Sequence, residues 1–290
     1  MKLPKMFKIF KYIYNSIKND LRKLPSYNAP KLPRVAFCLY GIVGGTNGKS
    51  GDKGNEATSE DILNLGYKHY KKHIFDKNKN IDVFIHTWSV DSEEEIKKLY
   101  QPKKSTFQKQ IIFDIPDYVK GEHKRKQNHY SRWYSTKKVI ELKSLYEKKN
   151  NFKYDIIFLT RFDIAWQKNL DFSKYDPQFF YAADCFQVKP LWGFIPLKYG
   201  YPYQNEGIAD LWFFSNSNYM DLFSTLYDQL NEYSKPDKCP NSPNTGITNH
   251  KLTSYHLKQK GLINKLRFVF NHFGSNEIDP LVRNKYFWAK

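Results

Sequence analysis

The sequence predicts an α/β protein in which a mostly parallel sheet is flanked by helices. The first observation is that short apolar segments alternate with longer amphipathic ones, which is typical of strand–helix–strand units. The second is that the first apolar segment is followed by a glycine-rich loop and then by a helical pattern. The third is size, because 290 residues that are 40% hydrophobic can bury a large core.

The globular domain is expected to span 34–290, after a short proline-containing linker. Its first strand is predicted at 34–40, and a glycine-rich loop follows. Ser59 and the two acids after it indicate the start of a helix, because hydroxyl caps and acidic residues favour a helix N-terminus. The remaining elements of the first half are strands predicted at 81–87, 111–115 and 155–160 and helices predicted at 93–100 and 137–149.

The second half of the chain continues the alternation with less regular spacing. The segment 186–205 is rich in proline, glycine and aromatic residues and is predicted to be a long loop, a feature that is often functional in compact domains. A second such loop is predicted at 236–244. The other elements are strands predicted at 179–182, 211–215 and 266–270 and helices predicted at 218–233 and 248–260.

Residues 1–33 form a separate region, predicted as a basic amphipathic helix and a linker. Apolar residues recur there among many lysines, a pattern typical of helices that lie on an anionic membrane surface. The alternative is a terminal helix packed on the domain with a solvated lysine face. No apolar run approaches the ~20 residues of a membrane span, and the N-terminus lacks a signal-peptide pattern. We therefore expect a cytoplasmic protein that is peripheral at the inner face of the cytoplasmic membrane.

The charge balance predicts an anionic partner. The 47 basic residues outnumber the 29 acidic ones and give a net charge of +18, which suits a nucleotide, a phospholipid, an acidic glycan or a nucleic acid. Because the positive charge is spread over the chain and no known nucleic-acid motif is present, nucleic acid is not the expected partner. The 3 cysteines are widely spaced and indicate neither a disulfide framework nor a zinc site.

The strongest candidate site follows the apolar run that ends at Leu159. Arg161 and Asp163 come directly after this buried strand and flank one aromatic residue. In parallel sheets, ligands bind outside the carboxyl ends of the strands. Arginine matches phosphate oxygens, and carboxylates hold Mg²⁺ or Mn²⁺ beside phosphates. The alternative is a structural ion pair that closes the strand end.

Two other strand ends should lie at the same edge of the sheet. After the first strand, Gly41, Gly44 and Gly45 could turn backbone amides towards a diphosphate. A P-loop is not indicated, because that motif needs a glycine where Val43 stands. The second strand brings His86 to this edge, where it would either contact the ligand or serve as a structural histidine.

Further candidates come from the flanking segments. Arg132 precedes the helix predicted at 137–149 and could meet a phosphate at that helix N-terminus. Glu206 and Asp210 lie between the aromatic-rich loop and a strand, where a carboxylate could act as a general base on an acceptor hydroxyl. A turn-capping role for Asp210 is the alternative.

Three strings in this order resemble landmarks of bacterial surface-polysaccharide glycosyltransferases with a GT-A-like, Rossmann-like nucleotide-sugar domain: Val35-Ala-Phe-Cys-Leu-Tyr-Gly, Asp82-Val-Phe-Ile-His-Thr-Trp and Tyr154-Asp-Ile-Ile-Phe-Leu-Thr-Arg-Phe-Asp. The resemblance covers about 34–275. It implies a divalent metal, Mn²⁺ or Mg²⁺, held by an Asp-x-Asp motif, for which this chain has Arg161-Phe162-Asp163. The resemblance also implies a late metal-ligating histidine, and His272 occupies a similar position.

Together these features predict a transferase that moves a sugar from a nucleoside diphosphate sugar to a hydroxyl of a capsule, lipooligosaccharide or other glycan, with or without a lipid link. Asp163, with or without a metal, and Arg161 and Arg132 would neutralise the leaving diphosphate. Three alternatives stay open: a nucleic-acid-binding protein, a non-catalytic member of the fold that binds a glycan or membrane, and a glycan phosphotransferase. Whether the transfer inverts or retains stereochemistry is equally open.

Overall fold

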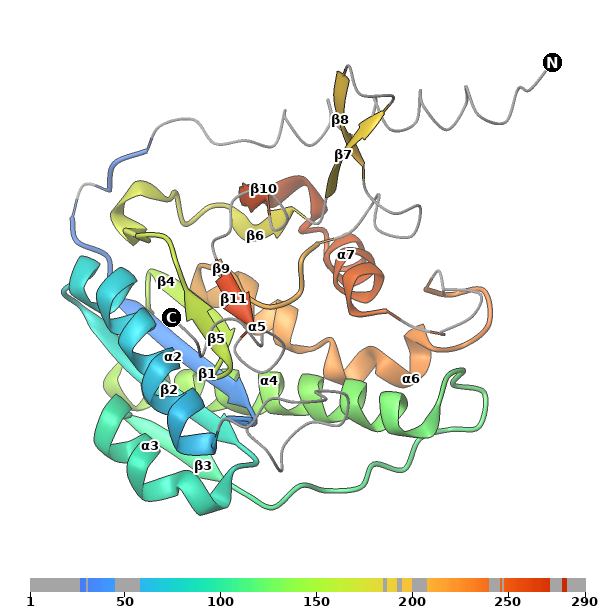
Figure 1. The fold of residues 1–290 in the computed structure, drawn as a ribbon, viewed down its shortest axis with the longest axis horizontal. Helices are drawn as coiled ribbons and strands as arrows, with labels where there is room; N and C mark the ends of the chain where they lie inside the picture. Colours follow the sequence, from blue (N-terminus) through green and yellow to red (C-terminus); the bar gives the residue numbers. More distant parts are fainter. Residues whose placement is uncertain are drawn as a thin grey trace.

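The computed structural model describes residues 27–29, 31–44, 58–184, 187–191, 195–199, 208–239, 246, 248–271 and 278–280. Of the predicted N-terminal region 1–33, the structure describes only 27–29 and 31–33, which belong to the linker, so the predicted helix lies outside the described residues. The expected α/β class is confirmed, with a seven-stranded, mostly parallel sheet between layers of helices (Figure 1).

The main sheet has one antiparallel strand, β9, among its seven strands. In order across the sheet, these strands are β10 (Leu266–Asn271), β6 (Phe180–Asp184), β9 (Phe213–Ser215), β4 (Ile156–Arg161), β1 (Val35–Gly41), β2 (Ile81–Thr87) and β3 (Lys104–Phe107). Two small antiparallel pairs are described besides it: β5 (Ile164–Trp166) with β11 (Ile278–Pro280), and β7 (Gln187–Leu191) with β8 (Ile195–Tyr199).

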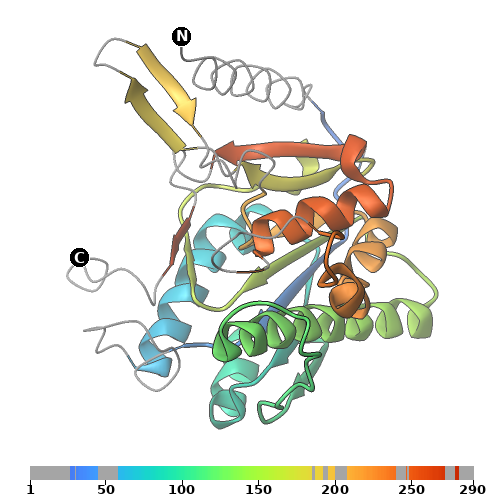
Figure 2. The same cartoon turned by 90° about the vertical axis from the view of Figure 1, so that its right-hand side faces the viewer.

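Helices cover both faces of the sheet, because alternate residues of each strand point to opposite sides. Val35, Phe37 and Leu39 of β1 pack in one core with residues of α2 and α3, whereas Ala36 and Cys38 pack in a second core with α4, α5 and α7. Figure 2 shows α2 and α4 on opposite sides of the strands. The helices are α2 (Ser59–His73), α3 (Glu93–Tyr100), α4 (His123–Asn150), α5 (Ser217–Ser224), α6 (Leu230–Tyr233) and α7 (Asn249–Gln259), and the 3₁₀ turns are Phe75–Lys77, Val90–Ser92, Phe172–Lys174, Tyr227–Gln229 and Ile263–Lys265.

The strand order reverses at β1, and this places the candidate site. From β1 the chain builds β2 and β3 on one side, and α4 then returns it across the other face to β4, on the opposite side of β1. Tyr40 of β1 is paired with both His86 and Arg161 in parallel register. The predicted convergence of these strand ends is therefore confirmed, and they meet at a topological switch point, where open α/β sheets bind ligands.

The third strand was predicted in the wrong place. β3 is Lys104–Phe107, a strand at the edge of the sheet. Its residues are mostly polar and only half-buried, so the sequence shows no apolar run that would predict a strand there. The apolar segment 111–115 is instead an irregular connection in which Ile112 is 88% exposed. Gln127 of α4 replaces the missing strand partner, because its side-chain amide bonds both the N–H and the carbonyl of Phe113, at 2.9 and 2.8 Å.

The helix predicted at 137–149 begins fourteen residues earlier than expected, so α4 has 28 residues. The buried face of its first half carries Tyr130, Trp133, Ser135 and Thr136, and these polar and aromatic side chains do not form an aliphatic stripe. Arg132 consequently lies inside the helix, and the prediction that it precedes a helix N-terminus is wrong. Despite its length, α4 is too polar to cross a membrane, and no other described helix qualifies.

The remaining differences concern short elements of the second half. The predicted helix 218–233 is divided into α5, a 3₁₀ turn and α6, and the strand predicted at 211–215 forms only at its last three residues. Part of the predicted loop 186–205 forms the β7–β8 pair.

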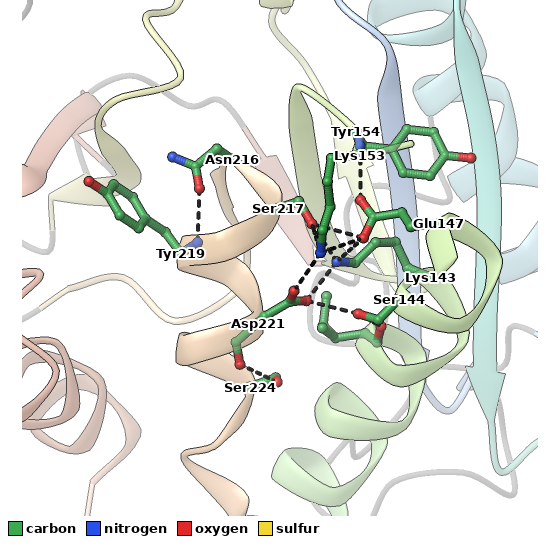
Figure 3. Close-up of polar contacts among 11 residues, drawn as sticks. Lys143, Ser144, Glu147, Lys153, Tyr154, Asn216, Ser217, Tyr219, Asp221 and Ser224 are labelled. Atoms are coloured by element: carbon green, nitrogen blue, oxygen red, sulfur yellow. Dashed lines mark hydrogen bonds and ion pairs between the residues drawn. The ribbon is translucent and has the colours of Figure 1, made fainter. Parts of the chain in front are cut away.

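A buried ionic cluster fixes α4 to α5 and to the start of β4 (Figure 3). Lys143 is fully buried and its Nζ donates to Glu147 at 3.0 Å, to Asp221 at 2.6 Å and to Ser217 at 2.8 Å. The second oxygen of Glu147 accepts the backbone N–H of Tyr154 at 2.8 Å. Each buried charge thus has a partner, as low-dielectric surroundings require.

Replacing Lys143 with methionine should destabilise the fold, because the buried Glu147 carboxylate would lose its nearest cation. We expect the unfolding free energy to fall by about 3–5 kcal/mol in urea denaturation. The control is Lys148→Met, an exposed change on the same helix, which should alter stability by less than about 0.5 kcal/mol. Equal effects of the two substitutions would contradict this assignment.

Candidate functional site

The first strand ends in a turn that requires glycine. Gly41 and Gly44 have φ values of 96° and 105°, a region that residues with a Cβ rarely adopt. The Gly41 N–H donates to Ser135 Oγ of α4 at 2.9 Å, and the Gly44 carbonyl accepts from Ser59 Oγ of α2 at 2.6 Å. The turn is therefore held between helices on the two faces of the sheet, at its carboxyl edge.

Arg161 and Asp163 form a bidentate ion pair at the corner between β4 and β5. The Arg161 Nε donates to Asp163 Oδ1 at 2.7 Å, and Nη2 donates to Oδ2. Phe162 between them is fully buried, which turns both charged side chains to the same side of the chain. The Asp163 side chain is only 2% exposed, so this fork-like pair is shielded from water.

A second ion pair lies beside the first. Arg132 of α4 donates through Nη1 to Asp210, which follows β6 and precedes β9, and the two side chains are only 11% and 12% exposed. His250, at the start of α7, places Nδ1 3.7 Å from Asp210 Oδ1. Burial alone would raise the pKa of Asp210, but Arg132, His250 and Arg161 together hold that pKa well below its usual range.

Tyr40 connects the two ion pairs. Its ring lies 5.8 Å from the Arg132 guanidinium carbon, and burial raises the pKa of its hydroxyl while both arginines oppose that rise. Within the described part of the chain, Tyr40 Oη and the Nε and Nη2 of Arg132 are buried without a hydrogen-bond partner. An unsatisfied buried donor costs roughly 1–3 kcal/mol. Donors from β1 and α4 thus gather where an oxyanion could satisfy them.

His86 occupies the predicted edge but is already engaged. The side chain is fully buried, with Nδ1 2.8 Å from Ser135 Oγ and Nε2 3.2 Å from Gln108 Oε1. Burial lowers the pKa of His86 to about 4, so the ring is neutral at pH 7. In this arrangement both ring nitrogens are used within the protein, which favours the structural role over ligand contact.

The described residues do not fit a resident divalent metal. Both oxygens of Asp163 are bonded to Arg161, and Asp210 is held by Arg132. No group of three His, Cys, Asp or Glu side chains within the described ranges could hold an ion. The carboxylates of the described site are thus engaged by arginines, and no chemical step is assigned to a metal.

Three predicted site residues, Gly45, Glu206 and His272, lie outside the described residues. Of the others, the structure brings Arg132, Arg161, Asp163 and Asp210 together beside the Gly41 turn.

Tyr40 and His250 were missed by the sequence analysis. Tyr40 is the last side chain before the Gly41 turn, and its position in the alternating strand pattern already directed it to the same face as Cys38. His250 gave no comparable signal, because only the fold places the start of α7 beside Asp210.

No protein-family model matches the chain, and a search of curated proteins finds no similar sequence. The fold and the site therefore establish the structural class of this protein and not its family. The chain is an α/β protein with a mostly parallel, Rossmann-compatible sheet and two shielded arginine–carboxylate pairs near its switch point.

Stability should fall as the pH decreases from about 6.5 to 4. Burial lowers the pKa of His86, His129 and His256 to about 4, from the ordinary value of 6.5. Between pH 6.5 and 4 the unfolded chain binds protons on these three histidines that the folded chain does not. The stabilisation is therefore complete above pH 6.5 and is lost as the pH falls towards 4. The unfolding free energy should change with pH by up to about 4 kcal/mol per pH unit, since each of the three protons contributes about 1.4 kcal/mol per unit.

Urea denaturation at several pH values measures this slope. His256→Gln, remote from the arginine pairs, should reduce the slope by about one proton. Stability that does not change with pH across the window would contradict the neutral, buried state of these histidines.

Proposed function

We propose that this protein binds a nucleoside diphosphate sugar at the carboxyl edge of β1 and β4 and transfers the sugar to a hydroxyl of a bacterial surface glycan. One observation carries the proposal: buried donors near Arg161 lack hydrogen-bond partners among the described residues. These donors are Tyr40 Oη and the Nε and Nη2 of Arg132. A phosphate oxygen accepts such bonds, and arginine presents its donors in a planar fork that suits phosphate.

The position of these groups supports the same ligand. The switch point between β1 and β4 is the place where doubly wound sheets bind nucleotides. Gly41 and Gly44 have no side chains and allow the chain to turn sharply there, while the Gly41 and Val43 N–H groups donate to Ser135 and Ser89. A mostly parallel sheet with the single antiparallel strand β9 is compatible with the GT-A-like domain that the sequence resembles.

Charge neutralisation of the leaving diphosphate would be the main catalytic contribution. Arg132 and Arg161 supply it in this proposal, and their carboxylate partners orient them when no ligand is bound. In this proposal the guanidinium groups supply the positive charge that the metal implied by the resemblance would otherwise bring.

Asp210 would act as the general base for an inverting transfer. As it stands, Asp210 is a weak base, because Arg132 and His250 stabilise its ionised form. A phosphate that draws Arg132 away would weaken this stabilisation and raise the basicity of the carboxylate. Donor binding and acceptor activation would then be coupled through one guanidinium group.

The N-terminal 1–33 region and the net charge of +18 support a place at an anionic membrane surface, where lipid-linked glycans are built. The membrane location is proposed separately from the donor site, because it depends on the sequence alone.

Thermal unfolding with a panel of UDP-, GDP-, CMP- and dTDP-sugars tests the donor site, because a ligand that binds only the folded state raises Tm. We expect one nucleotide class to raise Tm. The increase should be lost in Arg132→Met and Arg161→Met, whose donors would contact the phosphates.

The matched control is Arg267→Met in β10, an arginine that donates to the backbone carbonyls of Asn264 and Leu266 and lies 4.0 Å from the Phe179 ring. This variant should retain the nucleotide effect. Binding of random oligonucleotides without any response to nucleotide sugars would favour the nucleic-acid alternative, and nucleotide binding without sugar hydrolysis or transfer would favour a non-catalytic member.

A further inference from the structure

The helix α7 begins at the edge of the sheet that carries the proposed donor site. β10, into which α7 leads, is parallel to β6, and both run in the direction of β4, because β6 and β4 are each antiparallel to β9. A helix that packs on the sheet and leads into such a strand runs against that strand, so its N-terminus lies at the carboxyl edge. The aligned peptide dipoles give this end of α7 a partial positive charge, which favours an anion there.

Side-chain contacts bring the first residue of α7 next to Arg132. The Oδ1 of Asn249 accepts from His129 Nδ1 at 2.7 Å and from Trp133 Nε1 at 3.2 Å, so it bonds to two residues of α4. The Trp133 ring in turn lies 4.9 Å from the Arg132 guanidinium carbon. The start of α7 is therefore fixed against the turn of α4 that supplies this arginine.

Asp210 shows that the arginine and the helix end are close enough for one ligand. One oxygen of Asp210 accepts from Arg132 Nη1, and the other lies 3.7 Å from Nδ1 of His250, the second residue of α7. A single carboxylate thus reaches both groups. A diphosphate is longer than a carboxylate and has two anionic centres, so it can contact the arginine with one phosphate and the helix end with the other.

Thr248 precedes α7 with a hydroxyl that is buried and has no hydrogen-bond partner among the described residues. The residue is only 7% exposed. A threonine at this position normally accepts an N–H of the first helical turn, but Thr248 makes no such bond. The hydrogen-bond ladder of α7 begins where the Leu252 N–H donates to the Thr248 carbonyl at 2.9 Å, so the N–H groups of 249–251 come before it. A hydroxyl beside N–H groups that the helix does not use is a donor set that suits phosphate.

We propose that the N-terminus of α7 is a second phosphate subsite of the donor site. Thr248 Oγ1 and the first-turn N–H groups bind one phosphate, while Arg132 and Tyr40 bind the other. This subsite depends on the proposed donor function and makes it more specific. Donors with a diphosphate fill both subsites, whereas the CMP-sugars, which have a single phosphate, leave one of them empty.

Calorimetric titration of the full chain with inorganic pyrophosphate and orthophosphate at constant ionic strength tests the subsite. Thr248→Val removes the hydroxyl at nearly constant volume and should weaken pyrophosphate binding about tenfold, with less than about a twofold effect on orthophosphate. Thr248→Ser keeps the hydroxyl and should bind pyrophosphate as the unmodified chain does. The control is Thr253→Val on the same helix, a threonine whose hydroxyl already donates to the Asn249 and His250 carbonyls. It should leave the binding of both anions unchanged.

An equal loss of pyrophosphate binding in the two valine variants, or an equal loss of both anions in Thr248→Val, would overturn the proposal. So would a chain that does not bind pyrophosphate. The nucleotide class that raises Tm gives a second readout, because its diphosphate should bind about tenfold more tightly than its monophosphate, and Thr248→Val should remove most of this difference.

The subsite and the transferase function can fail separately. Pyrophosphate binding that depends on Thr248, in a protein that ignores every nucleotide sugar, would retain the subsite and reject the proposed function. A Tm increase with nucleotide sugars that is unchanged in Thr248→Val, with equal affinity for the mono- and diphosphate, would retain the donor site and reject the subsite.

Discussion

Two shielded arginine–carboxylate pairs at one edge of the sheet are the constraint on which the site depends. A buried charge is tolerated only when a partner neutralises it, and truncating one partner of such a pair is strongly destabilising. Arg161 and Asp163 satisfy this condition locally, whereas Arg132 and Asp210 require α4 and the β6–β9 connection to be in place. The second pair therefore forms only when the fold is complete, and Tyr40 lies between the two as part of β1.

The two ion pairs also determine the charge and the available hydrogen-bond donors at this edge of the sheet. Two arginines and two aspartates balance in charge, so the unliganded site does not carry a large net field, yet Arg132 keeps two donor atoms without partners in the described chain. An incoming phosphate would satisfy these donors and compete with Asp210 for the guanidinium group. The structure thus contains a physical route by which binding of an anion changes the basicity of a neighbouring carboxylate.

The sequence predicted the elements whose signals are local. The buried strand Ile81–Thr87 and the short helix Glu93–Tyr100 have clear apolar patterns and charged ends, and both are confirmed. β3 and the first half of α4 were missed, because their stability comes from tertiary contacts: β2 pairs with β3, and Gln127 holds the segment that the pattern favoured as a strand. Arg132 was predicted as a site residue because it was expected to precede a helix N-terminus, which is wrong. Its pairing with Asp210, 78 residues away in the sequence, could be seen only in the fold.

The proposed function depends on arginine side chains at the β1–β4 switch point that hold the phosphates of the ligand. Its most direct test is NMR of the arginine Nε–Hε groups during titration with the nucleotide whose sugar raises Tm, with Arg132→Lys and Arg161→Lys used to assign the signals. We expect the Arg132 and Arg161 signals to shift saturably with the bound fraction, while the Arg267 signal stays unchanged. Saturable nucleotide binding that leaves both signals unchanged would contradict it.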